Sequence, residues 1–333
     1  MAKIAILGCG YGTALGVLFT KYGHEVTTWT KFEEEAEQLR RDREHKRLLK
    51  GVKLPENLGV TTDPAVVSGK DIIIVCIPSA FYREAVAAVK PFVEKNTVVV
   101  NASKGLEEKT GLRLSQVIRQ ELPDNPIAVI TGPCHAEEVA RFDPTTEVCA
   151  SYEPETALYL QRTLANESYR IYINDDVIGC ELGGVLKNPI ALGCGIARGM
   201  GLGDNSIAAL MTRGMTEITR LGVGLGASWK TFTGMAGIGD LIVTCTSQHS
   251  RNFRAGFLIG QGMPAEEAVK SIGTVEGYFN ARTAFQLARE HNIDTPIIEQ
   301  IVNICFHGGN PKKSISALMG RASKHEREVF WTD

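Results

Sequence analysis

The chain of 333 residues carries a formal net charge of −2, and 44% of its residues are apolar. This length suits two domains better than a single core, and the near-neutral charge argues against nucleic-acid binding as the primary role. No stretch approaches the roughly 20 apolar residues that a membrane-spanning helix needs. Glycines interrupt the apolar N-terminal run before a signal-peptide cleavage region, so we expect a cytoplasmic protein without a membrane span.

Eight cysteines are scattered through apolar segments, without a C-x-x-C pair and without a histidine at zinc-site spacing. We therefore expect buried, reduced thiols and no bound metal. Cys134 stands next to His135, but neighbours in sequence seldom face each other, so we do not expect a catalytic Cys–His pair.

In chain order, the first half alternates segments typical of strands with segments typical of helices. Strands are predicted at residues 3–7, 25–29, 71–77, 97–101, 127–131 and 169–173, and helices at residues 13–22 and 80–89. Residues 71–77 are nearly all apolar, as a strand buried on both faces must be. Strands that alternate with crossover helices predict an α/β fold with a parallel, doubly wound, Rossmann-like sheet.

After residue 173 the strand signals fade, and helix-forming residues interrupted by glycines take over. Apolar spacing predicts helices at residues 207–221, 265–272 and 281–291. We place the boundary between residues 175 and 176. The prediction is an N-terminal α/β domain of residues 1–175 and an all-α C-terminal domain of residues 176–333.

A glycine-rich turn, Gly8-Cys9-Gly10-Tyr11-Gly12, joins the first predicted strand to the first predicted helix. Glycines in this position let the backbone approach a pyrophosphate, and the following helix N-terminus presents free N–H groups to it. We expect the first domain to bind NAD or NADP, with Gly8, Gly10, Tyr11 and Gly12 at the cofactor. The third glycine stands one residue early for G-x-G-x-x-G, so a tight turn without a ligand stays open as the alternative.

The choice between NAD and NADP is made at the end of the second strand, where an acid favours NAD and a basic residue tolerates the extra phosphate of NADP. The sequence there is Trp29-Thr30-Lys31, with no acid before Glu33. Lys31 therefore favours NADP, or the use of both cofactors. A lysine that is merely solvated is the alternative.

Three charged residues stand in apolar or small-residue segments. Lys104 follows a buried strand, so we expect it at the carboxyl edge of the sheet, where ligands bind in such folds. Lys187 lies among small and apolar residues, and Asp240 is the one acid within residues 237–245. Buried charges are costly unless paired, so these residues should meet one another or a ligand. Structural ion pairs inside a domain interface are the alternative.

Eight short motifs follow one another along the chain. They are Ser103-Lys104-Gly105, Gly132-Pro133-Cys134-His135-Ala136-Glu137-Glu138, Glu181-Leu182-Gly183-Gly184, Leu186-Lys187-Asn188, Gly203-Asp204-Asn205, Gly237-Ile238-Gly239-Asp240-Leu241, Ser250-Arg251-Asn252 and Val275-Glu276-Gly277. In this order they resemble the motifs of the NAD(P)-dependent glycerol-3-phosphate dehydrogenase family, in its bacterial form. The resemblance extends from about residue 3 to about residue 314.

The resemblance implies reversible hydride transfer between NAD(P)H and C2 of dihydroxyacetone phosphate, giving sn-glycerol 3-phosphate for phospholipid synthesis, in a homodimer. It implies that Lys187 is the general acid/base and that Lys104 is a second cation, which polarises the carbonyl. Asp240, Asn188 and Thr244 would orient the lysine and the substrate hydroxyls. A lysine does this work near neutral pH when burial and a second cation lower its pKa.

The resemblance also implies two sets of ligand contacts. Ser250, Arg251 and Asn252 would hold the substrate phosphate, with Ser250 capping a helix that starts at Arg251. The other implied substrate contacts are Lys104, Gly132, Cys134, Lys187 and Asp240. The other implied cofactor contacts are Lys104, Ala136, Arg251, Val275 and Glu276.

Three positions depart from the family's pattern. The glycine turn lacks one residue, so either its helix begins sooner or Thr13 takes the close-packing position, and we expect weaker cofactor binding than in relatives with the full turn. Cys134 stands where the family usually has a hydroxyl, and a thiol is a weak hydrogen-bond partner. Pro189 follows Lys187-Asn188, and a proline inside a helix predicts a kink beside the lysine.

Two other functions fit parts of the sequence. One is a dehydrogenase of the same two-domain build that acts on another small hydroxy compound, although a phosphate-binding Ser250-Arg251-Asn252 argues against it. The other is a non-catalytic dinucleotide-binding or sensor protein, which only the shortened turn supports. Initial rates with dihydroxyacetone phosphate and each reduced cofactor separate the three functions.

Overall fold

A computed structural model describes residues 1–323, 325 and 326 of the chain, which divides into two compact units. The first unit comprises Met1–Ser103 and Leu112–Val177, and the second comprises Lys104–Gly111 and the chain from Ile178 onward. The border at Val177 lies close to the boundary predicted between residues 175 and 176. The segment Lys104–Gly111, which we expected in the N-terminal domain, belongs instead to the second unit.

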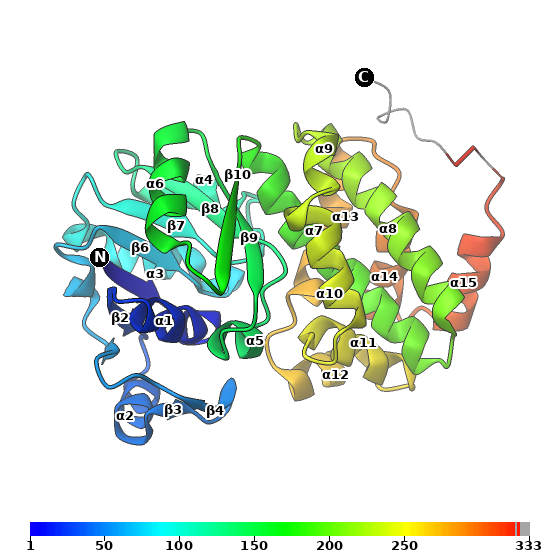
Figure 1. The fold of residues 1–333 in the computed structure, drawn as a ribbon. Helices are drawn as coiled ribbons and strands as arrows, with labels where there is room; N and C mark the ends of the chain where they lie inside the picture. Colours follow the sequence, from blue (N-terminus) through cyan, green and yellow to red (C-terminus); the bar gives the residue numbers. More distant parts are fainter. Residues whose placement is uncertain (324, 327–333) are drawn as a thin grey trace. The chain divides into compact units, whose positions relative to one another are not determined.

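The first unit is built on an eight-stranded sheet with the order β10-β9-β8-β7-β6-β1-β2-β5 (Figure 1). Its strands are β1 (Lys3–Leu7), β2 (Glu25–Trp29), β5 (Gly59–Thr61), β6 (Ile72–Val75), β7 (Val98–Asn101), β8 (Ile127–Thr131), β9 (Thr145–Ser151) and β10 (Tyr169–Asn174). The doubly wound fold that we predicted is confirmed, and six of the eight strands lie where the sequence pattern predicted them. We did not predict β5 and β9.

One pair of strands, β8 and β9, runs antiparallel, while all other neighbouring pairs of this sheet are parallel. The prediction of a parallel sheet is therefore wrong at this pair. The connection between the two strands spans residues 132–144 and contains only the short helix α5 (Ala136–Ala140). A parallel pair needs a crossover that returns the chain to the opposite end of the strands. Here β9 instead starts at the end of the sheet where β8 stops.

Helices cover both faces of this sheet. They are α1 (Tyr11–Lys21), α2 (Glu33–Asp42), α3 (Tyr82–Val89), α4 (Leu114–Glu121), α5 and α6 (Pro154–Leu164). Ile4 and Ile6 of β1 join the apolar core under α1 and α6, whereas Ala5 and Leu7 join a second core under α3 and α4. Burial on both faces explains why these strands are continuous apolar runs. Beside the sheet, β3 (Glu44–His45) and β4 (Leu49–Lys53) form an antiparallel hairpin that we did not predict.

From Ile178 onward the described residues contain helices and no strand, which confirms the predicted all-α character. The helices are α7 (Val177–Gly199), α8 (Asp204–Gly224), α9 (Trp229–Phe232), α10 (Asp240–Thr246), α11 (Arg251–Gly260), α12 (Ala265–Ile272), α13 (Glu276–Glu290), α14 (Pro296–Phe306) and α15 (Pro311–Met319), with a π-helical turn at Met235–Gly239. In the described part of the chain, no helix combines the length and the apolar character needed to cross a membrane.

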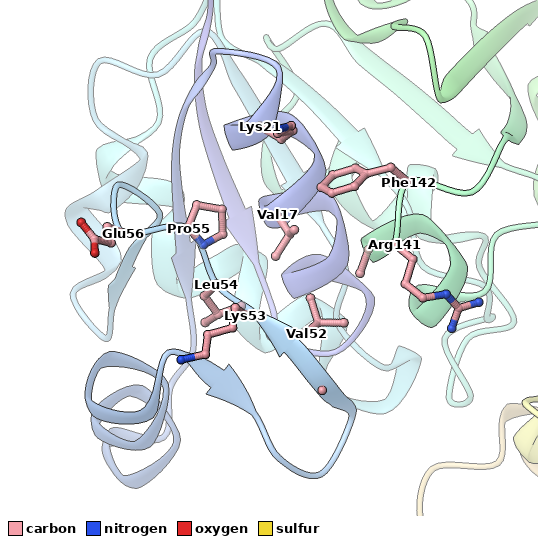
Figure 2. Close-up of a pocket in the computed structure, with 11 residues that line it drawn as sticks. Val17, Lys21, Val52, Lys53, Leu54, Pro55, Glu56, Arg141 and Phe142 are labelled. Carbon is pink, nitrogen blue, oxygen red and sulfur yellow. The ribbon is translucent and has the colours of Figure 1, made fainter.

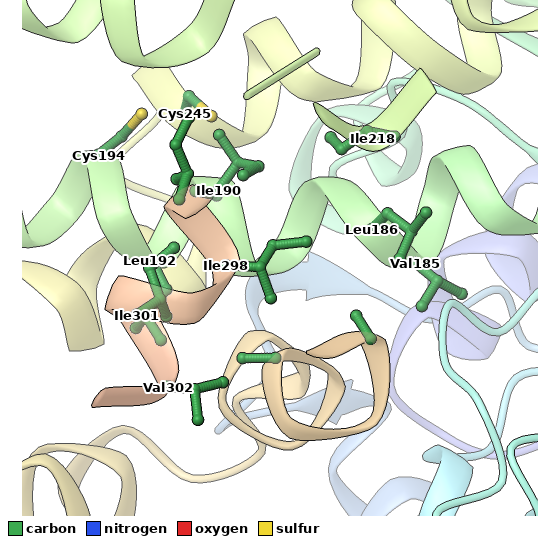
Figure 3. Close-up of a cluster of buried hydrophobic side chains, with 14 of the residues drawn as sticks. Val185, Leu186, Ile190, Leu192, Cys194, Ile218, Cys245, Ile298, Ile301 and Val302 are labelled. Carbon is green, nitrogen blue, oxygen red and sulfur yellow. The ribbon is translucent and has the colours of Figure 1, made fainter. Parts of the chain in front are cut away.

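Helix α7 is the centre of the second unit, because every residue from Gly179 to Ala197 is buried. Figure 3 shows Val185, Leu186 and Ile190 of this helix within a cluster that also takes side chains from α8, α10 and α14. A helix buried all round is apolar all round, which makes a lysine in it exceptional. The helix continues through Pro189 as one element.

Glycines bring α11 directly onto α7. A Cβ on Gly256 would lie 2.0 Å from the carbonyl oxygen of Leu192, and a Cβ on Gly195 would lie 2.1 Å from the carbonyl oxygen of Phe253. Larger residues at these positions would push the two backbones apart. This close packing fixes the N-terminus of α11, with its Ser250-Arg251-Asn252 motif, relative to the centre of α7.

Candidate active site

The charged residues that we expected to meet gather around one carboxylate of the second unit. Asp240 is 1% exposed and Lys187 is 5% exposed. The Lys187 Nζ lies 2.5 Å from Asp240 Oδ1 and 2.5 Å from the Oγ1 of Thr244, and the Lys104 Nζ lies 2.8 Å from Asp240 Oδ2. Two ammonium groups thus share one buried carboxylate, as the high cost of an unpaired buried charge requires.

Local packing places Asp240 opposite Lys187. A Cβ on Gly183 of α7 would lie 2.3 Å from the carbonyl oxygen of Ala236, so the π-helical turn lies directly on α7. Asp240 follows this turn as the first residue of α10, where a negative charge is favourable next to the helix N-terminus. Thr244, one turn further along, donates its hydroxyl to the carbonyl oxygen of Asp240 at 2.6 Å.

Two buried asparagines join three helices of the same unit. The Nδ2 of Asn188 on α7 donates to the carbonyl oxygen of Gly184 at 3.2 Å. The Nδ2 of Asn252 on α11 donates to Asn188 Oδ1 at 2.9 Å, and the N–H of Gly277 on α13 donates to Asn252 Oδ1 at 2.8 Å. This chain of hydrogen bonds brings Ser250-Arg251-Asn252 and the first turn of α13 to the helix that carries Lys187.

The two motifs at these helix starts differ in exposure. Ser250 is the N-cap of α11, and its Oγ accepts a hydrogen bond from the N–H of Phe253 at 3.2 Å, so the predicted cap is confirmed. Arg251, the first residue of the helix, is exposed. At the start of α13, Val275 is fully buried, whereas Glu276 is partly exposed. Any ligand contact of Val275 must therefore come from its backbone.

In the first unit, the glycine turn leads directly from β1 into α1. Gly8 has a φ of +106°, and a Cβ there would lie 2.5 Å from the carbonyl oxygen of Cys76. The helix begins at Tyr11, and a Cβ on Gly12 would lie 2.7 Å from the side chain of Ile6. The missing residue is thus absorbed by an earlier helix start, the first of our two alternatives, and Gly12 keeps the close-packing position.

This turn fits a dinucleotide pyrophosphate. Gly10 is the N-cap of α1 and has no side chain to cap it, so no side chain accepts from the first N–H groups of the helix. Free N–H groups at a helix N-terminus are the donors that such an anion takes.

The Tyr11 side chain takes part in a buried hydrogen-bond network of the first unit. Its hydroxyl donates to Glu147 Oε2 at 2.8 Å, and the hydroxyl of Tyr169 donates to the same oxygen. Burial raises the pKa of both tyrosines, so both hydroxyls stay donors. The Tyr11 hydroxyl is therefore already engaged within the first unit.

Sequence reasoning missed Glu147, which is 1% exposed. Its Oε1 has no hydrogen-bond partner among the described residues. The signal was present, because Glu147 is the one charged residue within residues 145–151, as Asp240 is within residues 237–245. Gly132 belongs to this neighbourhood, since it has a φ of +150° and its Cβ would lie 3.0 Å from the Cα of Glu147. Cys134 is partly exposed, and Ala136 begins α5.

Lys31 lies just beyond β2, where we expected it, and has partners that we did not foresee. Its Nζ lies 3.2 Å from Glu84 Oε1 of α3. The ammonium also lies 5.5 Å from the ring centre of Phe32 and 5.2 Å from that of Phe81. Both rings are more than half exposed.

The predicted site residues divide between the two units. The first unit holds Gly8, Gly10, Tyr11, Gly12, Lys31, Gly132, Cys134 and Ala136. The second unit holds Lys104, Lys187, Asn188, Asp240, Thr244, Ser250, Arg251, Asn252, Val275 and Glu276. Each set is assembled within its own unit.

A hollow elsewhere on the first unit has a different character. It measures about 460 Å³ and is lined by apolar side chains that include Val17, Val52, Leu54 and Phe142. Figure 2 shows the charged end of Lys53 directed away from this lining. None of the predicted site residues lines the hollow, whose lining also includes Lys21, Glu56 and Arg141.

The eight cysteines form no disulfide, and six of them are buried. Within residues 1–323, 325 and 326, no group of three or more His, Cys, Asp or Glu side chains is arranged to hold a metal ion. Burial raises the pKa of Cys9 and of Cys149 to about 12, and it raises that of Cys305 to about 12 as well. Thiols of this kind are inert.

Comparisons with known proteins agree over nearly the whole chain. The family models described as NAD-dependent glycerol-3-phosphate dehydrogenase N-terminus and C-terminus match residues 3–157 and 176–316. A glycerol-3-phosphate dehydrogenase (NAD(P)+) of Moorella thermoacetica is 48% identical over 329 residues, which are 98% of this chain and 98% of the relative. Its counterpart in Desulfitobacterium hafniense is 47% identical over 330 residues, 98% of this chain and 94% of the relative. The crystal structure of glycerol-3-phosphate dehydrogenase from Coxiella burnetii has a TM-score of 0.92 and 36% identity, covering 96% of this chain and 99% of that one.

Proposed function

The chain belongs to the NAD-dependent glycerol-3-phosphate dehydrogenase family, and from this premise we propose that it reversibly reduces dihydroxyacetone phosphate to sn-glycerol 3-phosphate with NADH or NADPH. The observation that carries this proposal is the cluster in which Lys187 and Lys104 share the buried carboxylate of Asp240. Carbonyl reduction needs a proton donor held in place, and this cluster holds one.

Lys187 is the general acid/base of the proposed reaction. The bound nicotinamide supplies the hydride in one direction and accepts it in the other. As C2 of dihydroxyacetone phosphate is reduced, the Lys187 ammonium donates a proton to the carbonyl oxygen, and in reverse the amine takes it back. The carboxylate of Asp240 contacts both ammonium groups, so it holds Lys187 beside a second cation, and a neighbouring cation favours release of the proton.

The partners of Lys187 orient it. Asp240 and Thr244 each accept a hydrogen bond from the Lys187 ammonium, which fixes the direction of this side chain. Lys104, on the other oxygen of Asp240, brings a second positive charge that stabilises the developing alkoxide. Asn188, anchored on the same helix, contributes through the hydrogen bonds that hold α11.

Arg251 is proposed to bind the substrate phosphate. Its guanidinium is exposed at the first position of α11, where backbone N–H groups add to its charge. Ser250 and Asn252 flank it, although their side chains already hold the helix in place. Gly132 and Cys134 are the other proposed substrate contacts. Ala136, Val275 and Glu276 are the other proposed cofactor contacts.

The cellular setting is also part of the proposal. The eight free thiols are typical of a reducing compartment, which supports a place in the cytoplasm. The family resemblance supports a homodimer that provides glycerol phosphate for phospholipid synthesis.

Initial rates test the activity and the phosphate contact together. The purified chain should oxidise NADH or NADPH when dihydroxyacetone phosphate is added. Arg251→Ala should raise the KM for dihydroxyacetone phosphate at least about tenfold, the size of a lost charge-assisted pair, and change the rate with unphosphorylated dihydroxyacetone little. No turnover by the wild type with either cofactor would refute the activity, and equal losses on both substrates would refute the role of Arg251.

A further inference from the structure

An ion pair links a loop and a helix on either side of the glycine turn. β1 pairs with β2 on one side and with β6 on the other. In a parallel sheet the segments that follow β2 and β6 therefore flank the turn that follows β1. Lys31 comes from the first of these segments, and Glu84 and Phe81 come from the second. The contact between Lys31 and Glu84 thus joins both sides of the region where the adenosine half of a dinucleotide binds.

Two of the acids nearest to the end of β2, Glu33 and Glu35, are already engaged. Glu33 accepts from the Oγ1 of Thr62 at 2.6 Å and from Arg40 at 2.5 Å. Glu35 accepts from the Oγ1 of Thr30 at 2.6 Å. An acid that is free to accept from both ribose hydroxyls is what makes such a site selective for NAD. Lys31 is the basic group at this position that can bind a ribose phosphate.

Glu84 competes with a ribose phosphate for the ammonium group of Lys31. Its carboxylate, on an exposed side chain, offsets the Lys31 charge, so a ribose phosphate must replace Glu84 as the partner of the ammonium. The rings of Phe32 and Phe81 hold the ammonium by cation–π contacts that do not depend on Glu84. Lys31 is therefore kept in place whichever anion it binds.

We infer that Glu84 is a specificity-determining residue, which narrows the difference in affinity between NADP(H) and NAD(H) by holding Lys31. The inference rests on the cofactor binding of the proposed function. The quantity measured is the ratio of the affinities for NADPH and NADH. A loss of folded protein lowers the binding of both cofactors and leaves this ratio unchanged.

The test is titration calorimetry of the whole chain with NADPH and with NADH, without substrate. Glu84→Gln should raise the preference for NADPH about two- to fivefold, the size expected of an exposed ion pair. Lys31→Met should lower the preference. In the Lys31→Met background, Glu84→Gln should have no further effect on the ratio.

Glu25→Gln is the matched control. Glu25, at the start of β2, pairs with Lys70 at 3.1 Å and is exposed, so the variant removes the same charge at the other end of the same strand. The ratio should stay at its wild-type value. An unchanged ratio in Glu84→Gln, or an equal rise in the Lys31→Met background, would overturn the inference and leave the proposed function standing. Binding of neither cofactor by the wild type would overturn both.

Discussion

Asp240 and Glu147, one from each unit of this protein, are buried carboxylates with opposite surroundings. Asp240 in the second unit and Glu147 in the first are both 1% exposed. The oxygens of Asp240 are shared by the ammonium groups of Lys187 and Lys104. One oxygen of Glu147 accepts from the hydroxyls of Tyr11 and Tyr169, and its other oxygen has no partner among the described residues.

The difference lies in what the partners can do with a proton. Lysine ammonium groups release and take up protons when their surroundings favour it. Burial raises the pKa of Tyr11 and Tyr169, so those hydroxyls keep their protons. Asp240 therefore belongs to a group that can perform proton transfer, whereas Glu147 fixes the start of α1 through Tyr11. The degree of burial, which is the same for Asp240 and Glu147, does not distinguish these two roles.

The largest expected effect is on the proton transfer itself. Lys187→Met removes the ammonium but keeps a long side chain within α7. We expect the rate of the chemical step to fall about 10²–10⁴-fold, the usual share of a general acid, with cofactor affinity nearly unchanged. Single-turnover rates with dihydroxyacetone phosphate measure the step. Near wild-type rates would remove Lys187 from the proposed mechanism.

The next effect is on stability and compares the two carboxylates directly. Asp240→Asn leaves two buried cations without their anion, and we expect a loss of about 3–5 kcal/mol in the free energy of unfolding. Glu147→Gln keeps an oxygen that accepts from the tyrosines and strands no cation, so the loss should be about 1 kcal/mol or less. Denaturant midpoints of both variants provide the comparison. Equal losses would mean that the partners of the two carboxylates do not matter.

The smallest effect concerns a third buried carboxylate, Glu217, whose partners are backbone groups. It is 1% exposed and accepts from the N–H groups of Ile297 and Ile298, each at 2.8 Å. Burial raises the pKa of Glu217 from 4.5 to about 7. The folded protein then holds this proton more tightly than the unfolded chain does. The resulting stability is fully present below about pH 4.5 and is lost as the pH rises through about 7.

A shift of this size corresponds to about 3 kcal/mol of stability. Glu217→Gln stays neutral, so the wild type should lose up to that amount relative to the variant between pH 4.5 and 8. Denaturant midpoints across this range measure the difference. Parallel stability curves would mean that the hydrogen bonds from the N–H groups of Ile297 and Ile298 fully compensate the burial of the Glu217 carboxylate.

Much of the site could be predicted from local sequence, because helix starts and tight turns depend on a few neighbouring residues. Ser250 caps α11 as its position before Arg251 predicted. The glycine turn lies between a strand and a helix as expected, although the structure was needed to show that α1 begins at Tyr11. That earlier start removes the shortened turn as an argument for a non-catalytic sensor, since Gly12 still packs closely.

The partners of the site residues could not be predicted in the same way. Glu147 was overlooked because its strand, β9, was not predicted and enters the sheet antiparallel to β8. Glu84 was overlooked because nothing near Lys31 in sequence points to α3. Apolar periodicity tells which face of an element is buried, but it does not tell which side chain lies opposite.

By itself, the sequence determined the alternation of elements in the first half, the all-helical second part and the residue types at the site. These follow from local conformational preference and from the periodicity of burial. Tertiary structure alone decided that Lys104, 136 residues away from Asp240, shares that carboxylate with Lys187. It also decided that the segment of Lys104 belongs to the helical unit. Contacts over such separations depend on how whole elements pack, and no local preference of the chain encodes them.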